Sequence, residues 1–192
     1  MRKFLPFIIG GGLLLVLVFW FFSIKNGAVR VNQEVNKEWG NVETSYQRRN
    51  DLIGNLVKTV QGSADFEKST LEKVTELRQQ ILNLNVNDTD ISQLQQIEKM
   101  SKELIRSLNV VVENYPELKA DALYSKMMDD IQEQNENVGA AITIFNRNVE
   151  LFNNHIEVFP NNLINTLTLS KKAIRPFKDN LATENFDYKP NF

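Results

Sequence analysis

Arg49 is the residue whose type and position in the sequence could most directly do chemistry. It falls in a stripe of residues spaced alternately four and three apart, which is the face that a helix presents to its partners. The stripe consists of Val35, Trp39, Val42, Tyr46, Arg49, Ile53, Leu56 and Val60. A guanidinium stays charged, so burying it without oxygen acceptors would cost several kcal/mol or more. Arg49 therefore indicates either a buried polar layer that sets helix register or a ligand site, and we favour the layer.

Counting residues along each helix from one end of the bundle identifies candidate partners that lie at the same level as Arg49. If four helices alternate in direction, Phe159 returns to the level of Ile24, and Arg49 lies 25 residues above Ile24. Counting the same number of residues back from Phe159 gives Gln134. The predicted layer joins Arg49 to Gln134 and to one nearby carboxylate. The candidate carboxylates are Glu76, Glu133 and Glu136.

Other residue types that support catalysis or metal binding are scarce. The chain has no cysteine and a single histidine, His155, which excludes disulfides, thiolate catalysis and the usual Cys/His zinc sites. A di-iron carboxylate bundle needs two Glu-x-x-His pairs, and Phe152 stands where the glutamate before His155 would be. We expect Asp129, Glu133 and Glu136 to lie on a solvated helix face rather than to bind calcium. The sequence predicts no enzyme, no cofactor and no metal site.

The charge balance argues against nucleic acid as a partner. The chain carries 22 basic and 24 acidic side chains. Two of the basic residues, Arg2 and Lys3, lie in a short N-terminal tail at residues 1–3. The rest of the chain therefore has 20 basic and 24 acidic residues. No basic face for phosphate binding is predicted.

An uncharged run from Phe4 to Ile24 follows this tail and predicts a transmembrane helix. About 20 apolar residues are enough to cross the hydrocarbon core of a bilayer. A cleaved signal peptide would have a shorter apolar core and small residues at its end, whereas this run ends with bulky Trp20, Phe21 and Phe22. We therefore expect a retained, single-pass anchor in a lipid bilayer. We place the N-terminus inside and the rest of the chain on the non-cytoplasmic side.

Long apolar periodicities with few breaks between them predict a helical bundle over residues 25–160. Its expected helices span about 28–61, 65–84, 91–112 and 116–159. The expected fold is all-α, with the transmembrane helix followed by an elongated antiparallel four-helix, coiled-coil-like bundle. Asn26 and Gly27 leave open whether the transmembrane helix and the first bundle helix are continuous. Residues 161–192 are expected to form a partly ordered C-terminal tail.

The inward faces of the last two bundle helices show irregular spacing. On the third helix we expect Leu94, Ile97, Leu104, Leu108 and Val111 to face inward. On the fourth, one four-four step of the seam around Val138 resembles a stutter. This seam runs through Tyr124, Met127, Ile131, Gln134, Val138, Ile142, Phe145, Val149, Phe152, Ile156 and Phe159. Two asparagines beside this seam, Asn146 and Asn153, either hydrogen-bond across the bundle or to another subunit, or are solvated. The basic segment at 171–178 either lies near the bilayer or is solvated.

Three separated motifs resemble those of the LemA family of membrane-anchored helical proteins. The motifs are RRNDLIGNLV at 48–57, ENYPELKA at 113–120 and NRNVELFNNHIEVFPNNL at 146–163. Gly54 departs from the pattern, which usually has proline there, so a kink in the first bundle helix is not implied. The resemblance implies a single-pass protein of the bacterial inner membrane, with an unsettled molecular role and no enzyme activity. The motif residues that we assign to interaction or packing are Arg48, Asp51, Asn55, Tyr115, Asn146, Asn153 and Phe159.

Together these features predict a non-enzymatic, membrane-anchored helical scaffold or protein-interaction module. We expect it to form a homo-oligomer, because apolar residues outside the strict seam, such as Val57 and Ile105, could be buried between subunits. Other envelope proteins are further candidate partners. The alternative is a ligand-sensing or signalling ectodomain, which is disfavoured because the sequence shows no second apolar span and no output module.

Overall fold

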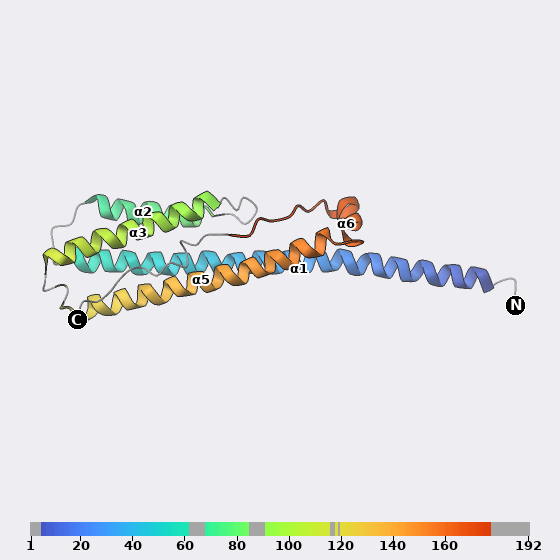
Figure 1. Cartoon of the computed structure of the whole chain (residues 1–192), viewed down its shortest axis with the longest axis horizontal. Helices are drawn as coiled ribbons and strands as arrows, with labels where there is room; N and C mark the ends of the chain where they lie inside the picture. The colour runs from blue at the N-terminus through green and yellow to red at the C-terminus, as the bar shows by residue number, and fades with distance from the viewer. Residues whose placement is uncertain (1–4, 62–67, 85–90, 116–117, 119, 178–192) are drawn as a thin grey trace. The chain divides into compact units, whose positions relative to one another are not determined.

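A computed structural model describes residues 5–61, 68–84, 91–115, 118 and 120–177 of the 192-residue chain (Figure 1). The expected tail at residues 1–3, Phe4, and residues 178–192 of the expected C-terminal tail lie outside these ranges. The elements are α1 (Leu5–Gln61), α2 (Lys68–Leu82), α3 (Ile91–Asn114), α5 (Ala122–Glu157), α6 (Asn161–Ile164) and the π-helix η1 (Asn165–Leu169). The described residues form helices and no strand, so the predicted all-α class is confirmed.

Helix α1 contains both the apolar N-terminal run and the predicted first helix of the bundle. It continues from Leu5 to Gln61 without a break at Asn26 or Gly27, which answers the question of continuity. Residues 8–20 are exposed within the protein and include large side chains such as Phe19, at 77%. The apolar part of α1 is long enough to cross a membrane, a property that membrane spans share with signal sequences.

The chain divides into two compact units, which we describe separately. The first unit comprises residues 1–37 and 147–175, and the second comprises residues 38–146 and 176–192. Within the second unit, helix α1 packs antiparallel to α5. The rings of Trp39 and Phe145 lie 5.2 Å apart, and further along α1 the Thr59 hydroxyl lies 3.6 Å from the sulfur of Met127. Residue numbers thus rise on one helix as they fall on the other.

Helices α1 and α2 are also antiparallel within the second unit. Asp51 forms an ion pair of 3.4 Å with Arg78, and a Cβ placed on Gly54 would lie 3.2 Å from the Val74 side chain. Helix α2 in turn packs against α3. This arrangement agrees with the predicted order of alternating helices.

The predicted seam of α1 is buried throughout, because every member from Val35 to Val60 is at most 5% exposed. The predicted seam of α5 was wrong at three positions, one of which, Phe159, lies beyond the end of the helix and is 73% exposed. Met127 and Gln134 are only half-buried, whereas their neighbours Met128 and Asn135 lie in the core. Apart from Ala141, the buried positions of α5 are Tyr124, Met128, Ile131, Asn135, Val138, Ile142, Phe145, Val149, Phe152 and Ile156. These positions alternate strictly between steps of four and three, so the helix has no stutter.

The described helices differ from the predicted ones mainly at their ends. Helix α3 continues to Asn114, two residues beyond its expected end, and α5 begins at Ala122 rather than near residue 116. Residues 65–67, 116, 117 and 119 of the predicted helices lie outside the described ranges. The expected C-terminal tail begins with α6 and η1, followed by a non-helical segment at 170–177.

Candidate functional site

The guanidinium of Arg49 lies in the core of the second unit, where it is 1% exposed. It donates to both carboxylate oxygens of Glu98 on α3, with Nη2 to Oε1 at 2.9 Å and Nη1 to Oε2 at 3.3 Å. Nη1 also donates to the amide oxygen of Asn135 on α5 at 3.0 Å, and Nη2 to the hydroxyl of Ser101 on α3 at 3.3 Å. Residues of α1, α3 and α5 therefore meet in one buried polar layer, which we call the Arg49 layer.

The partners of Arg49 are as buried as the arginine itself. Glu98 is 0%, Ser101 1% and Asn135 4% exposed. The ring of Tyr46 lies beneath the guanidinium, with 4.9 Å between Cζ and the ring centroid, which is close enough for a cation–π contact. The Ser101 hydroxyl donates in turn to the carbonyl of Ile97 at 2.8 Å.

Bidentate pairing and the added hydrogen bonds explain how a charge can remain in this core. Removing two ions from water costs several kcal/mol for each ion, and their attraction offsets this cost only when the geometry is good and the other polar groups are satisfied. The parallel contacts from Arg49 to Glu98 meet the first condition, and Ser101 and Asn135 contribute to the second. Sliding one helix by a turn would separate these groups by about 5 Å. The Arg49 layer is therefore well suited to fixing helix register.

The predicted partners of Arg49 need correction. Glu76, Glu133 and Glu136 are exposed, and Gln134 is only half-buried. The carboxylate comes from α3, and the amide on α5 is Asn135, one residue from the predicted one. One residue along a helix changes the height by only about 1.5 Å but rotates the side chain by about 100°. Counting heights therefore located the layer on α5 but selected the wrong face.

A signal for Glu98 and Ser101 was present in the sequence of α3. The expected inward face jumps seven residues from Ile97 to Leu104, which leaves one step of a three-four pattern unfilled. Ser101 fills that step, and Glu98 lies one turn before it. The gap in the apolar stripe of α3 thus marks the point at which this helix contributes polar groups to the core.

Two asparagines of α5 hold the non-helical segment at 170–177. Within the first unit, the Asn153 amide donates to the Ile174 carbonyl at 2.8 Å and accepts from the Ile174 N–H at 2.9 Å. Within the second unit, Asn146 makes the same two contacts with Phe177, at 2.6 and 2.7 Å. Each side-chain amide therefore satisfies both backbone groups of one residue, much as a neighbouring β-strand would. Both asparagines therefore hydrogen-bond within the chain, to the non-helical segment at 170–177 rather than across the bundle.

A third asparagine repeats the pattern at the start of this segment. Asn165 in η1 donates to the Lys171 carbonyl at 2.9 Å and accepts from the Lys171 N–H at 3.0 Å. The three held residues, at 171, 174 and 177, recur every third position, which is the repeat of a polyproline II helix. Asn146 and Asn153 are seven helical residues apart, a rise of about 10.5 Å. Three residues of extended chain cover about 9 to 10 Å, so the two spacings match.

His155 joins the end of α5 to α1 within the first unit. Its Nε2 lies 3.1 Å from the carbonyl oxygen of Ile24, and because a carbonyl accepts, this nitrogen is the donor. Gly27 lies against the ring, since a Cβ at this position would be 2.8 Å from the His155 Cε1 atom. The glycine is therefore needed for close packing of the two helices, not for a turn.

The remaining motif residues lie mainly at the surface. Arg48, Asp51 and Asn55 are exposed, and the Asp51 carboxylate pairs with Arg78 at 3.4 Å. Tyr115 is half-buried, and Phe159 is 73% exposed. The structure does not gather these residues into one site.

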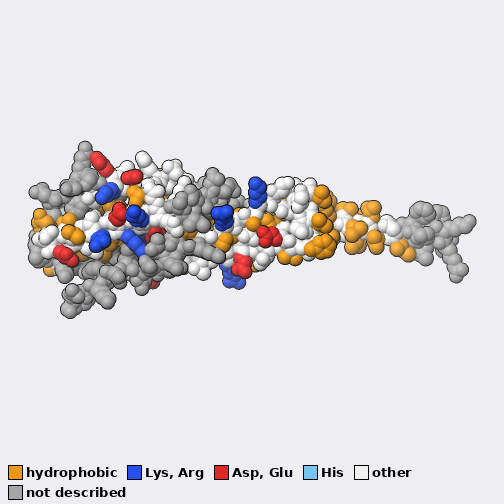
Figure 2. Space-filling view, turned by 45° about the horizontal axis from the view of Figure 1, so that its top comes forward, with side chains coloured by type: hydrophobic (Ala, Val, Ile, Leu, Met, Phe, Trp, Pro, Cys, Tyr) orange, Lys and Arg blue, Asp and Glu red, His pale blue; other side chains and the backbone are white. Residues whose placement is uncertain are grey.

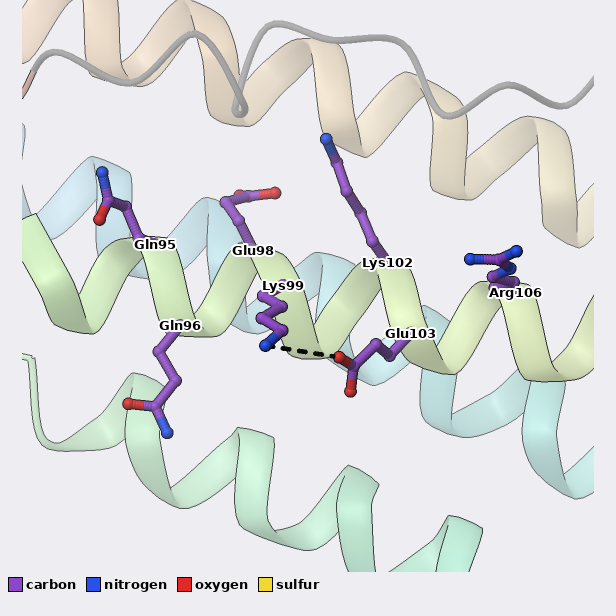
Figure 3. A pocket seen from close by; sticks show the side chains of 7 residues that line it. All are labelled: Gln95, Gln96, Glu98, Lys99, Lys102, Glu103 and Arg106. Carbon is purple, nitrogen blue, oxygen red and sulfur yellow. Dashed lines mark ion pairs between the residues drawn. The ribbon is translucent and has the colours of Figure 1, made fainter.

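A cavity of about 500 Å³ is lined by residues of α3 (Figure 3). Figure 3 shows that Lys99 turns toward Glu103, 4.0 Å away, while Glu98 and Lys102 extend from another side of the helix. The described lining residues are Gln95, Gln96, Glu98, Lys99, Lys102, Glu103 and Arg106. Cationic, anionic and amide side chains are mixed, and most of the cavity surface is formed by their apolar atoms, so the cavity offers apolar as well as polar contacts and favours no single charge.

Metal-binding groups are not gathered together in the part of the chain that the structure describes. No three His, Asp or Glu side chains there are arranged to hold an ion. The predicted solvated carboxylates Asp129, Glu133 and Glu136 are not brought into such a group.

Comparison with known proteins identifies the family. The family model described as "LemA family" matches residues 38–187, which is most of the chain. Protein LemA of Metamycoplasma hominis is similar, at 28% identity over 137 residues, which are 70% of this chain and 61% of that protein. The match thus spans about three fifths of the relative's length. The chain belongs to the LemA family.

Proposed function

We propose that the protein is a non-enzymatic, membrane-anchored helical scaffold of the bacterial envelope. The observation that carries this proposal is the continuity of α1, a single helix of 57 residues that contains the exposed apolar run and a buried stripe of the bundle core. One element thus couples the bilayer to the folded part of the chain. The Arg49 layer agrees with a structural role, because its charges are matched within the fold.

Retention of the apolar run is supported by the packing just beyond it. The Ile24 carbonyl accepts from His155, and Gly27 and Ala28 are buried. Cleavage in this region would cut a helix that packs against α5. We infer that the run is an anchor rather than a removed signal sequence.

The absence of cysteine from the chain allows a direct test of topology. A single cysteine introduced at exposed Lys126 would be the only thiol available to a maleimide. With the bundle on the non-cytoplasmic side, a membrane-impermeant maleimide should label Lys126→Cys in intact cells. Labelling only after permeabilisation would show that the bundle lies on the cytoplasmic side. Recovery of the protein in the soluble fraction would contradict the anchor.

Self-association forms the second part of the proposal. Val57 and Ile105, the residues expected between subunits, are buried inside the fold at 0% and 4% exposure, so they do not support it. Besides Leu123 in its first turn, α5 has two large apolar residues at the surface instead: Ile144 at 49% and Leu151 at 52%. They are seven residues apart on one helical face, which is the spacing of a helix–helix seam.

Disulfide trapping in the membrane tests this seam. Leu151→Cys should form a linked dimer on mild oxidation, because a symmetric contact through the seam would bring the two thiols together. Glu150→Cys, also exposed but rotated by about 100° on the same helix, is the matched control. Equal crosslinking of both variants, or a monomer at every protein concentration in mass-resolved chromatography, would contradict self-association.

The cavity on α3 supports a second candidate function, that of a ligand-sensing ectodomain. A ligand that binds only the native state must raise the melting temperature. A screen of small polar anions and zwitterions against the full chain in detergent micelles would test this candidate. A shift that disappears in Lys102→Gln would favour sensing over the scaffold.

A further inference from the structure

The turn formed by α6 and η1 presents large apolar side chains to the solvent. Four of them within ten residues are more than half exposed: Val158 at 57%, Phe159 at 73%, Leu163 at 54% and Leu167 at 80%. Figure 2 shows hydrophobic side chains gathered at the level of α6 and along the exposed part of α1. Single exposed apolar residues are common on soluble proteins, but a cluster of this kind marks a surface that is covered by something else.

Charge is excluded from this turn and resumes immediately beyond it. No residue from 158 to 170 carries a charge, whereas Glu157 precedes the turn and Lys171 and Lys172 follow it. Lys171, Lys172 and Arg175 are all exposed. An uncharged apolar segment next to basic residues is the pattern of a segment that lies in the headgroup region of a bilayer.

The position of the turn within the first unit is set by His155. Its contact with the Ile24 carbonyl places the end of α5 level with the last residue of the uncharged run. The chain then continues toward the apolar part of α1 before it reverses, as Figure 1 shows for α6. Ile164, 7% exposed, fixes α6 to the unit, and the chain leaves the turn at Ser170, which has a left-handed backbone with φ 49°.

We propose that the α6–η1 turn is a second membrane contact, in which Phe159, Leu163 and Leu167 enter the interface of the leaflet where the α1 span ends. The partner is the lipid surface itself. Lys171, Lys172 and Arg175 interact with anionic headgroups as the chain leaves the bilayer, and Asn165 and Asn153 hold the returning segment against the protein. The inference rests on the proposed anchor, because only a membrane-spanning α1 brings the turn to a bilayer.

Nitroxide labels on single cysteines would measure the depth of the turn. The full chain is reconstituted into vesicles of phosphatidylethanolamine and phosphatidylglycerol, with the label at Leu167→Cys or Leu163→Cys. Leu14→Cys reports on the span, and Glu150→Cys is an exposed control outside the turn. Collision rates are measured with oxygen, which concentrates in lipid, and with a water-soluble nickel chelate.

We expect the Leu167 and Leu163 labels to show nickel collisions several-fold rarer, and oxygen collisions several-fold more frequent, than the Glu150 label. A Leu167 label as open to nickel as Glu150, beside a lipid-like Leu14 label, would overturn the interfacial contact and leave the anchor intact. Low collision rates with both reagents at Leu167 would mean that protein covers the turn, which also overturns the proposal. A water-exposed Leu14 label would overturn the anchor and the inference with it.

Discussion

The core of the second unit and the first unit use different polar groups to hold their elements together, although Asn146 of the second unit also pairs with backbone. In the second unit, Arg49 and Glu98 place opposite charges in the core, and their contacts run from side chain to side chain. In the first unit, Asn153, Asn165 and His155 use neutral amide or imidazole groups, which pair with backbone atoms. Charged groups form the contact between side chains of different helices. Neutral groups form the contacts with backbone N–H and C=O groups of a non-helical segment or a helix end.

This difference has an energetic consequence. Removal of one member of a buried ion pair leaves the other charge without compensation in the core. Removal of a neutral group at a half-buried position leaves a backbone N–H or C=O that water can reach. We therefore expect losses of stability to be larger in the second unit than in the first.

The largest effect is expected for Arg49→Leu. The buried Glu98 carboxylate would lose its counter-charge, at a cost of about 3–5 kcal/mol in the free energy of unfolding. Denaturant unfolding of the full chain in detergent micelles, followed by circular dichroism, would measure it. Arg48→Leu, at the exposed neighbouring position, should change stability by less than about 0.5 kcal/mol. Equal stability of the two variants would show that the buried Arg49–Glu98 pair contributes no more than an exposed arginine does.

A smaller effect is expected for Gly27→Ala in the first unit. The new methyl group would lie 2.8 Å from the His155 ring, so the ring must move, at a cost of about 1–3 kcal/mol. Gly40→Ala is the matched control, because its methyl group meets nothing within 4 Å and should stabilise α1 by about 0.5–1 kcal/mol. The Gly27→Ala penalty should disappear in a His155→Ala background. A penalty that persists there would mean that the imidazole is not the obstacle.

Asn153→Ala should act locally rather than globally. It removes both contacts with Ile174, about 0.5–1.5 kcal/mol for each hydrogen bond. Amide hydrogen exchange at Ile174 should accelerate, while exchange in the core of α1 stays unchanged. Asn154→Ala, which alters an exposed neighbour, should leave the Ile174 amide as protected as before. Unchanged protection in Asn153→Ala would contradict the role of this amide.

The smallest effect is expected for Asp51→Asn. Its ion pair with Arg78 joins two exposed side chains, and such pairs contribute about 0–1 kcal/mol. Stability should change little and become independent of salt at this position. A loss as large as that of Arg49→Leu would show that burial does not decide the value of an ion pair in this chain.

The sequence predicted those features that depend on periodicity. Every member of the α1 stripe from Val35 to Val60 lies in the core, including Arg49, because a strict alternation of four and three leaves little choice of face. The same rule could have corrected α5. Replacing Met127 and Gln134 by Met128 and Asn135 removes the apparent stutter, so the irregular step was itself the sign of an error.

Other features depend on contacts between residues far apart in sequence. Whether Asn146 and Asn153 bind backbone, a second subunit or water is decided by the path of residues 170–177, and no local pattern encodes that path. Glu98 stood within an apolar stripe, yet matching it to Arg49 requires the relative rotation of α1 and α3, which a height count does not contain.

A double-mutant cycle would show whether Arg49 and Glu98 act as one matched ion pair in the core. The free energy of unfolding is measured for the natural chain, Arg49→Leu, Glu98→Leu and the double variant, all in the same micelles. We predict that each single change costs about 3–5 kcal/mol and that the double variant recovers most of one such loss, because neither charge is left alone in the core. A double variant whose loss equals the sum of the single losses would contradict this pairing.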